Sequence, residues 1–296
     1  MLGKIAVFET DDHPDVAAHR ARLLPALQRH LQSSGRDASV TPVHGGTLGI
    51  CFEAEIADEK RFLKTHLPDA AARASLTREA DILARLYGDT IVLDRFEVLL
   101  ADRTTRLCLL MPALIPLAGP MQPAEAAAMA DACSERLGDW RPANLPSLLQ
   151  YLAPAARALE MLSDRALLAP ATAAETRRLV ALLGDRLGGL PEALCHGDFG
   201  PKNIMLEGTE PRVIDWEDAF LGVAGYDYLY WLTFMENRTF LHTAAFGRTG
   251  LSPDIERAIL ALVVLLKSYL AVCSGAYLKH VVPAEARITE ILQLPL

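Results

Sequence analysis

The sequence predicts an α+β fold, with an antiparallel sheet in its first part and helices in a larger second part. Short apolar runs alternate with turn residues between residues 38 and 112, which is typical of an antiparallel meander. Residues 121–190 are rich in Ala and Leu at helical spacing. The proline-marked stretch 112–116 separates the two regions. We therefore expect an N-terminal lobe at 1–111, a linker at 112–116 and a helical lobe at 117–296.

The first lobe begins with an extension over residues 1–37. In this extension a short strand is expected at residues 4–9, and an amphipathic pattern predicts a helix over residues 15–31. Apolar runs then predict the five strands of the sheet, at residues 39–43, 50–57, 61–67, 91–101 and 106–112. Apolar residues on one face predict a helix over residues 75–86, between the third and fourth strands.

The second lobe is predicted to be helical with one interruption. Periodic apolar residues predict its helices, at residues 123–137, 146–163, 172–187, from about 226, and at 253–280. Two short strands, 203–206 and 212–215, interrupt this pattern. A β-rich lobe followed by a helical lobe is an arrangement in which ligands often bind between the two.

Composition and charge exclude several classes of protein. The chain has 29 basic and 37 acidic residues, for a net charge of −8, so no nucleic-acid partner is expected. Five scattered cysteines without a CxxC pair favour reduced thiols in a cytoplasmic protein. Residues 1–20 lack the apolar core of a signal peptide. The apolar stretch 255–273 contains Glu256, Arg257 and Lys267, which favours a buried helix over a membrane span.

The strongest motif is Cys-His-Gly-Asp-Phe-Gly-Pro-Lys-Asn at residues 195–203, followed by Ile-Asp-Trp-Glu at residues 214–217. Transfer of a γ-phosphoryl group needs a carboxylate near the attacking hydroxyl and oxygen ligands that hold magnesium across the phosphates. Asp198 can supply the base, and Asn203 and Asp215 can supply two metal ligands. Mg²⁺ prefers such a sparse set of oxygen ligands together with phosphate.

The pattern H-G-D-x-x-x-x-N with a following I-D-W resembles the aminoglycoside phosphotransferase and choline kinase superfamily, whose fold is similar to that of protein kinases. The resemblance implies a protein-kinase-like fold of two lobes and a magnesium-dependent kinase that phosphorylates a hydroxyl group of a small molecule. ATP is the expected phosphoryl donor, and GTP remains open as an alternative. Close identity is confined to residues 195–217, although the order of elements fits most of the chain.

The resemblance also implies roles for residues upstream of the motif. Lys64 lies on the third strand of the meander, where the superfamily places the lysine that holds the α- and β-phosphates. Glu79, in the next helix, is the expected ion-pair partner of Lys64. Lys60 is the competing lysine, but it follows Asp58 and Glu59 in a turn, where a solvated charge is expected.

Two further nucleotide contacts are expected from position. The loop 44–49 lies where a loop that covers the phosphates belongs, although a tight hairpin remains an alternative because it does not spell G-x-G-x-x-G. Backbone groups at the linker are candidates to bind adenine. The residues expected to bind nucleotide in these two segments are Gly45, Gly46, Thr47, Gly49, Met111 and Ala113.

Residues around the motif are given secondary roles. His196 is expected to orient the loop, and Asp227 resembles the aspartate that braces it from the start of a helix. Lys202 either touches phosphate or is solvated. The aromatic residues of this region are expected to lie mostly in the core; they are Tyr226, Tyr228, Tyr230, Trp231 and Phe234.

The acceptor remains open, as does the oligomeric state. An antibiotic of aminoglycoside-like or amine-bearing type is the first hypothesis, and a metabolic kinase for choline, ethanolamine or homoserine is the second. Carboxylates after the motif favour a cationic acceptor; they are Glu217, Asp218, Asp227 and Glu236. A non-catalytic kinase-like binding protein is expected to lose the motif residues, and a protein kinase needs a longer activation segment.

Overall fold

The computed structural model describes residues 16–33, 37–43, 49–275 and 282–295. The strand expected at residues 4–9 lies outside the described residues. Contacts divide the described chain into two compact units. The sheet unit contains the described residues up to Leu117 together with Ile204–Asp218, and the helical unit contains Ala118–Asn203 and the described residues from Ala219 onwards. The lobe limits inferred from the sequence stay a prediction.

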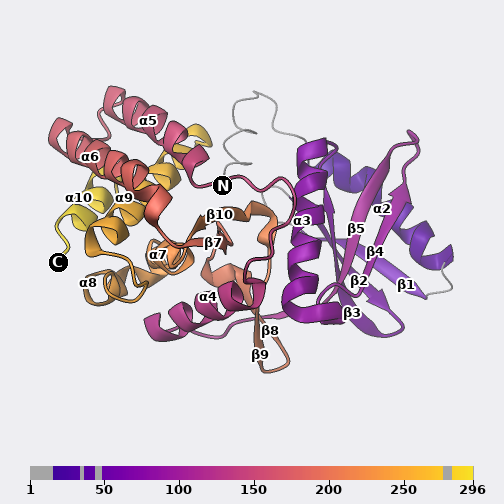
Figure 1. Cartoon of the computed structure of the whole chain (residues 1–296). Coiled ribbons are helices and arrows are strands. Elements are labelled where there is room, and N and C mark those ends of the chain that lie inside the picture. Colours follow the sequence, from indigo (N-terminus) through magenta and orange to yellow (C-terminus); the bar gives the residue numbers. More distant parts are fainter. Residues whose placement is uncertain (1–15, 34–36, 44–48, 276–281, 296) are drawn as a thin grey trace. The chain divides into compact units, whose positions relative to one another are not determined.

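The sheet unit contains the expected five-stranded antiparallel sheet, in the order β1-β2-β3-β5-β4 (Figure 1). Its strands are β1 (Ala38–Pro42), β2 (Gly49–Ile56), β3 (Glu59–His66), β4 (Asp94–Leu99) and β5 (Thr105–Pro112). Ala57 and Asp58 form the two-residue turn between β2 and β3, and both have a positive φ. This turn fixes the register of the hairpin, which pairs Cys51 with Lys64.

Two helices belong to the sheet unit, α2 (Val16–Ser33) and α3 (Ala70–Tyr87). Buried leucines of α2 join Phe52 and Leu63 in one hydrophobic core on one face of the sheet. Successive side chains of a strand point to opposite faces, so Lys64 points away from that core. It points toward α3, which contacts β3 and β5. The alternation of side chains along β3 therefore places Lys64 on the side of the sheet that faces α3.

A small second sheet completes this unit. It is formed by β6 (Ile115–Pro116), β8 (Ile204–Glu207) and β9 (Glu210–Val213), in the order β6-β8-β9. A 3-10 helix at Trp216–Asp218 follows β9 and packs against α3. The hydroxyl of Ser75 on α3 donates a hydrogen bond to the carbonyl oxygen of Glu217 in this turn. The chain after β9 is therefore held next to α3.

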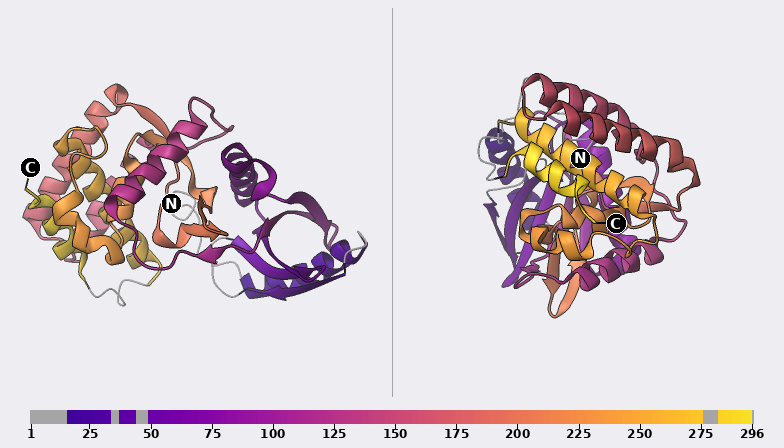
Figure 2. Two further views of the ribbon diagram at one scale, coloured as in Figure 1. Left: turned by 90° about the horizontal axis from the view of Figure 1, so that it is seen from below. Right: turned by 90° about the vertical axis from the view of Figure 1, so that its left-hand side faces the viewer.

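The helical unit is built around α9 (Pro253–Cys273), which packs against α5, α6, α7 and α10. Figure 2 shows α9 beside α6 and α10. The other helices are α4 (Pro123–Leu137), α5 (Leu149–Asp164), α6 (Pro170–Arg186), α7 (Tyr226–Leu232), α8 (Leu241–Ala244) and α10 (Ala284–Leu292). Most of α9 is buried, as its apolar sequence predicts. It ends at Cys273, earlier than residue 280, where the periodicity suggested an end.

Two short strands in the helical unit were not expected from the sequence. They are β7 (Glu192–Cys195) and β10 (Phe220–Val223), which pair antiparallel. β7 leads directly into the His-Gly-Asp motif, and β10 leads toward α7. None of the helices in the described parts of the chain is long and apolar enough to cross a membrane.

Candidate active site

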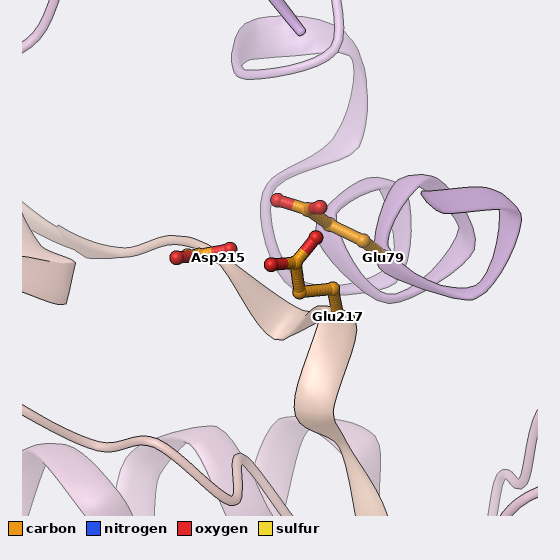
Figure 3. A group of neighbouring side chains, drawn as sticks. All are labelled: Glu79, Asp215 and Glu217. Carbon is orange, nitrogen blue, oxygen red and sulfur yellow. The ribbon is translucent and has the colours of Figure 1, made fainter. Parts of the chain in front are cut away.

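Lys64 lies at the centre of three carboxylates in the sheet unit. Its Nζ is 2.6 Å from Oε2 of Glu79, 2.6 Å from Oδ1 of Asp215 and 3.6 Å from Oε2 of Glu217. Figure 3 shows the three carboxylates turned toward one another. The side chains of Lys64 and Glu79 are only 8% and 1% exposed, whereas that of Asp215 is 35% exposed. Asp215 is therefore the most accessible carboxylate of the group.

Local structure explains how these side chains meet. Glu79 is on the buried face of α3, one turn from Leu76 and Leu83. Asp69 caps that helix by accepting a hydrogen bond from the backbone N–H of Ala72. Asp215 has φ +67°, a left-handed conformation that is uncommon outside glycine and clusters at functional sites. This conformation is consistent with the role expected for Asp215 from the motif.

The charges of this cluster shift its pKa values. Burial lowers the pKa of Lys64, but the carboxylates of Asp215, Glu217 and Glu79 outweigh burial and hold it well above the usual value, so the ammonium stays charged. Burial raises the pKa of Glu217 from 4.5 to about 7; Lys64 opposes this rise and Asp215 adds to it. The site thus holds a permanent cation next to a carboxyl group that titrates near neutral pH.

The donor set fits a magnesium ion held together with phosphate. Oxygen atoms of Glu79, Asp215 and Glu217 lie within 4.8 Å of one another. The three carboxyl groups outnumber the single ammonium of Lys64, and hard oxygen ligands suit Mg²⁺. Asp215 has the exposure that a ligand of an incoming metal needs, whereas Glu79 is committed to Lys64. The residues of this cluster therefore fit a magnesium ion.

The His-Gly-Asp loop lies in the helical unit, after β7. The backbone N–H of Asp198 donates to Nδ1 of the buried His196, at 3.2 Å. Nδ2 of Asn203 donates to the carbonyl oxygen of Asp198, at 2.8 Å, and lies 3.4 Å from Oδ2 of the same residue. Because the amide nitrogen is used in this way, its oxygen is the atom that Asn203 offers to a cation.

Asp227 at the start of α7 braces this loop, as the resemblance implied. Its carboxylate accepts hydrogen bonds from the backbone N–H groups of His196, at 2.8 Å, and Gly197, at 3.3 Å. Burial raises the pKa of Asp227, while His196 and the backbone donors oppose that rise. The carboxylate of Asp227 therefore holds the backbone of the loop and is not available to bind an acceptor in this geometry.

One contact of the loop was missed by the sequence reasoning. The hydroxyl of Tyr230 donates to Oδ1 of Asp198, at 2.7 Å. Tyr230 lies on α7 three residues after Asp227, so both residues project from neighbouring positions of one helix face. That spacing is the signal that could have found it.

The remaining expected residues have simpler positions. Gly45, Gly46 and Thr47 lie outside the described residues, and Gly49 is the first residue of β2. Met111 is buried in β5 opposite Phe62, and Ala113 is exposed just after β5. Lys60 and Lys202 are both exposed, which favours a solvated charge at each. The nucleotide contacts of these residues stay predictions.

Comparison with known proteins identifies the family. The model of the phosphotransferase enzyme family matches residues 39–259, and the chain belongs to that family. It is therefore a small-molecule phosphotransferase of the aminoglycoside phosphotransferase and choline kinase superfamily, as the motif resemblance implied. A search of curated proteins found no match.

Solved structures support the kinase-like α+β fold. A thermostable mutant of aminoglycoside phosphotransferase APH(4)-Ia, in complex with ADP and hygromycin B, aligns with TM-score 0.60 and 13% identity over 90% of this chain and 97% of that one. Spectinomycin phosphotransferase APH(9)-Ia, in complex with ADP and spectinomycin, aligns with TM-score 0.56 and 10% identity over 90% of this chain and 98% of that one. Choline kinase from Cryptosporidium parvum Iowa II aligns with TM-score 0.54 and 13% identity over 94% of this chain and 93% of that one. At these identities the likeness establishes the fold.

Proposed function

We propose that the chain transfers the γ-phosphoryl group of ATP to a hydroxyl group of an amine-bearing small molecule, such as an aminoglycoside-like antibiotic. The observation that carries this proposal is the buried ammonium of Lys64, held between Glu79 and Asp215. A cation fixed in this way is suited to bind the phosphates of a nucleotide. The ADP complexes of the two antibiotic phosphotransferases support a nucleotide as donor.

The reaction assigns one role to each residue. The carboxylate of Asp198 accepts the proton of the acceptor hydroxyl as its oxygen bonds to the γ-phosphorus. The bond from that phosphorus to the bridging oxygen of ATP breaks, and ADP leaves. Lys64 holds the α- and β-phosphates, and Glu79 holds Lys64 in place. Asn203 and Asp215 are the residues that would hold Mg²⁺, which when bound neutralises charge on the phosphates.

The preference for an amine-bearing acceptor rests on charge. Glu217 lies beside Lys64, Asp218 is buried and Asp227 braces the loop, so these carboxylates are engaged within the protein. The exposed Glu236 and the net charge of −8 are what support attraction of a cation. The presence of hygromycin B and spectinomycin in the ADP complexes of the two antibiotic phosphotransferases supports the antibiotic class.

A metabolic kinase for choline, ethanolamine or homoserine is the second candidate, supported by the alignment with choline kinase. A quaternary ammonium group is usually recognised by a cage of aromatic rings. The rings of Tyr230 and Phe234 already hold the ammonium of Lys267, with Nζ 3.7 and 3.6 Å from their centroids. This pair of rings is therefore not available as a cage for choline.

The test is a panel assay with the full chain. Hygromycin B, spectinomycin, choline, ethanolamine and homoserine are each incubated with ATP or GTP and Mg²⁺, and the products are examined for the added mass of one phosphoryl group. Phosphorylation of an amine-bearing antibiotic, and weaker turnover of its N-acetylated form at low salt, supports the proposal. Binding of MgATP without transfer to any compound would favour a non-catalytic kinase-like binding protein.

A further inference from the structure

Tyr230 makes a direct hydrogen bond to the carboxylate proposed as the base. Its hydroxyl lies 2.7 Å from Oδ1 of Asp198, a short and charge-assisted contact. Tyr230 is 2% exposed, so its ring is fixed by packing. The other carboxylate oxygen, Oδ2, lies 3.4 Å from the amide nitrogen of Asn203. The two contacts restrict rotation of the carboxylate from both sides.

The ring of Tyr230 is itself contacted by the ammonium of the half-buried Lys267. Nζ of Lys267 lies 3.7 Å from the centroid of the Tyr230 ring and 3.6 Å from that of Phe234. The same ammonium donates to Oγ1 of Thr233, at 2.8 Å. Lys267 is located in α9 between buried neighbours such as Leu266 and Ser268. Such a cation between two ring faces stabilises their positions.

The His-Gly-Asp loop also contacts the ring of Phe234 directly. A Cβ atom added at Gly200, two residues after Asp198, would lie 2.5 Å from Cζ of Phe234. The loop backbone therefore packs against the second ring of the cluster, with no space for a side chain. The Tyr230 and Phe234 rings are 5.6 Å apart, edge to face. The loop is thus held at the carboxylate by Tyr230 of α7 and at its backbone by Phe234, two residues after the end of α7.

A buried tyrosine ordinarily needs only some acceptor for its hydroxyl, and Tyr228 shows that case. Its hydroxyl donates to the carbonyl oxygen of Ala244, at 2.5 Å, in a contact within the packed helices. Tyr230 lies two residues further along the same helix and points to the loop carboxylate instead. Tyr228 therefore makes an ordinary structural contact, whereas Tyr230 contacts the carboxylate proposed as the base.

We propose that Tyr230 is a positioning residue that fixes the orientation of the Asp198 carboxylate, and that Lys267 holds Tyr230 in place. This inference rests on the proposed role of Asp198 as base. A base that is already oriented avoids reorganisation when the acceptor hydroxyl transfers its proton. Loss of the Tyr230 hydroxyl is expected to slow the chemical step and leave nucleotide binding unchanged.

The experiment is a double-mutant cycle in the full chain. Wild type, Tyr230→Phe, Asp198→Asn and the double variant are compared by the rate of ADP formation from MgATP, with hygromycin B as acceptor and with water alone. Tyr230→Phe should lower kcat about tenfold, with KM for ATP unchanged. In the Asp198→Asn background the same change should have no further effect, because Tyr230 acts through Asp198. Tyr228→Phe is the matched control and should leave kcat unchanged.

The outcomes separate the two proposals. An equal loss of kcat from Tyr230→Phe in both backgrounds would make Tyr230 merely structural and overturn the inference, as would wild-type kcat in Tyr230→Phe. Full activity of Asp198→Asn would instead overturn the proposed base, whatever Tyr230→Phe does. Lys267→Met should lower kcat about threefold and Lys267→Arg should restore it, because arginine also stacks on aromatic rings. Wild-type kcat in Lys267→Met would show that Lys267 is not needed to hold Tyr230 in place.

Discussion

The ammonium of Lys64 and the carboxylate of Glu79 form a buried ion pair, with 2.6 Å between Nζ and Oε2. Breaking a buried pair by removal of one charge leaves the other uncompensated. Here Asp215 also lies 2.6 Å from Nζ, so Lys64 keeps a charged partner when Glu79 is changed. Glu79 is therefore expected to position Lys64 more than to keep it charged.

Glu79→Gln should weaken binding of MgATP about tenfold, because Lys64 is then drawn toward Asp215 and Glu217. The free energy of unfolding should fall by about 1.5–3 kcal/mol, the contribution of a hydrogen bond to a charged group. Calorimetry and urea unfolding measure the two effects. Asp81→Asn is the control, since Asp81 lies on the same helix as Glu79 and forms an exposed ion pair with Arg95 of β4. Equal MgATP affinity in wild type and Glu79→Gln would contradict the role of Glu79.

Glu217 should make stability depend on pH. Burial raises its pKa from 4.5 to about 7 in the folded protein. The folded state then holds the proton between these two values and the unfolded state does not, so its contribution to stability is present below pH 4.5 and lost as pH rises through 7. Urea unfolding of the metal-free protein should show wild type losing stability relative to Glu217→Gln over this range. A difference that stays constant with pH would refute the assignment, and the exposed Glu236→Gln serves as control.

Asp215→Ala should abolish Mg²⁺-dependent binding of ATP, because it removes the accessible carboxylate of the cluster. Titration of the variant with ATP, with and without Mg²⁺, measures the effect. Unchanged affinity for MgATP would count against Asp215 as a ligand. Lys64 keeps its buried pair with Glu79 in this variant, so the fold is expected to be retained.

Gly225→Ala should destabilise the start of α7, which carries Asp227 and Tyr230. Gly225 has φ +84°, and an added Cβ would lie 2.3 Å from Cβ of Thr249. Gly119 has a similar φ of +86° with nothing within 4 Å, so Gly119→Ala measures backbone strain alone. We expect a loss of about 1–2 kcal/mol at Gly119 and about 2–5 kcal/mol at Gly225. Equal losses in urea unfolding would show that the contact with Thr249 relaxes freely.

Much of the fold could be predicted because its patterns are local. Alternation along residues 61–67 indicates that Leu63 and Lys64 face opposite sides, and helical spacing places Glu79 on the buried face of α3. The polar residues Asp58, Glu59 and Lys60 predict a turn, but in the structure the turn is Ala57 and Asp58, and Glu59 and Lys60 begin β3. β7 and β10 were missed because they pair with each other across residues 196–219, whereas the equally short β8 and β9 form a local hairpin.

The parts of the site that were missed depend on tertiary packing. Glu217 lies beside Lys64 only because the turn after β9 is held against α3, and no local pattern reports that contact. Tyr230 was assigned to the core from its aromatic character, and it is buried as expected. Its hydroxyl contact with Asp198 joins residues 32 positions apart, so it depends on how α7 packs beside the loop.

The central claim is that Asp198 is the base of a phosphoryl transfer. Asp198→Asn keeps the size of the side chain while removing the charge that accepts the proton, and it leaves one side-chain oxygen to accept a hydrogen bond from Tyr230 or Asn203. The measurement that tests the claim most directly is kcat for transfer from MgATP to the best acceptor of the panel, with the Kd of MgATP measured in parallel. If Asp198 is the base, kcat falls by roughly 100-fold or more while the Kd stays within about threefold. A kcat within about threefold of wild type would contradict it.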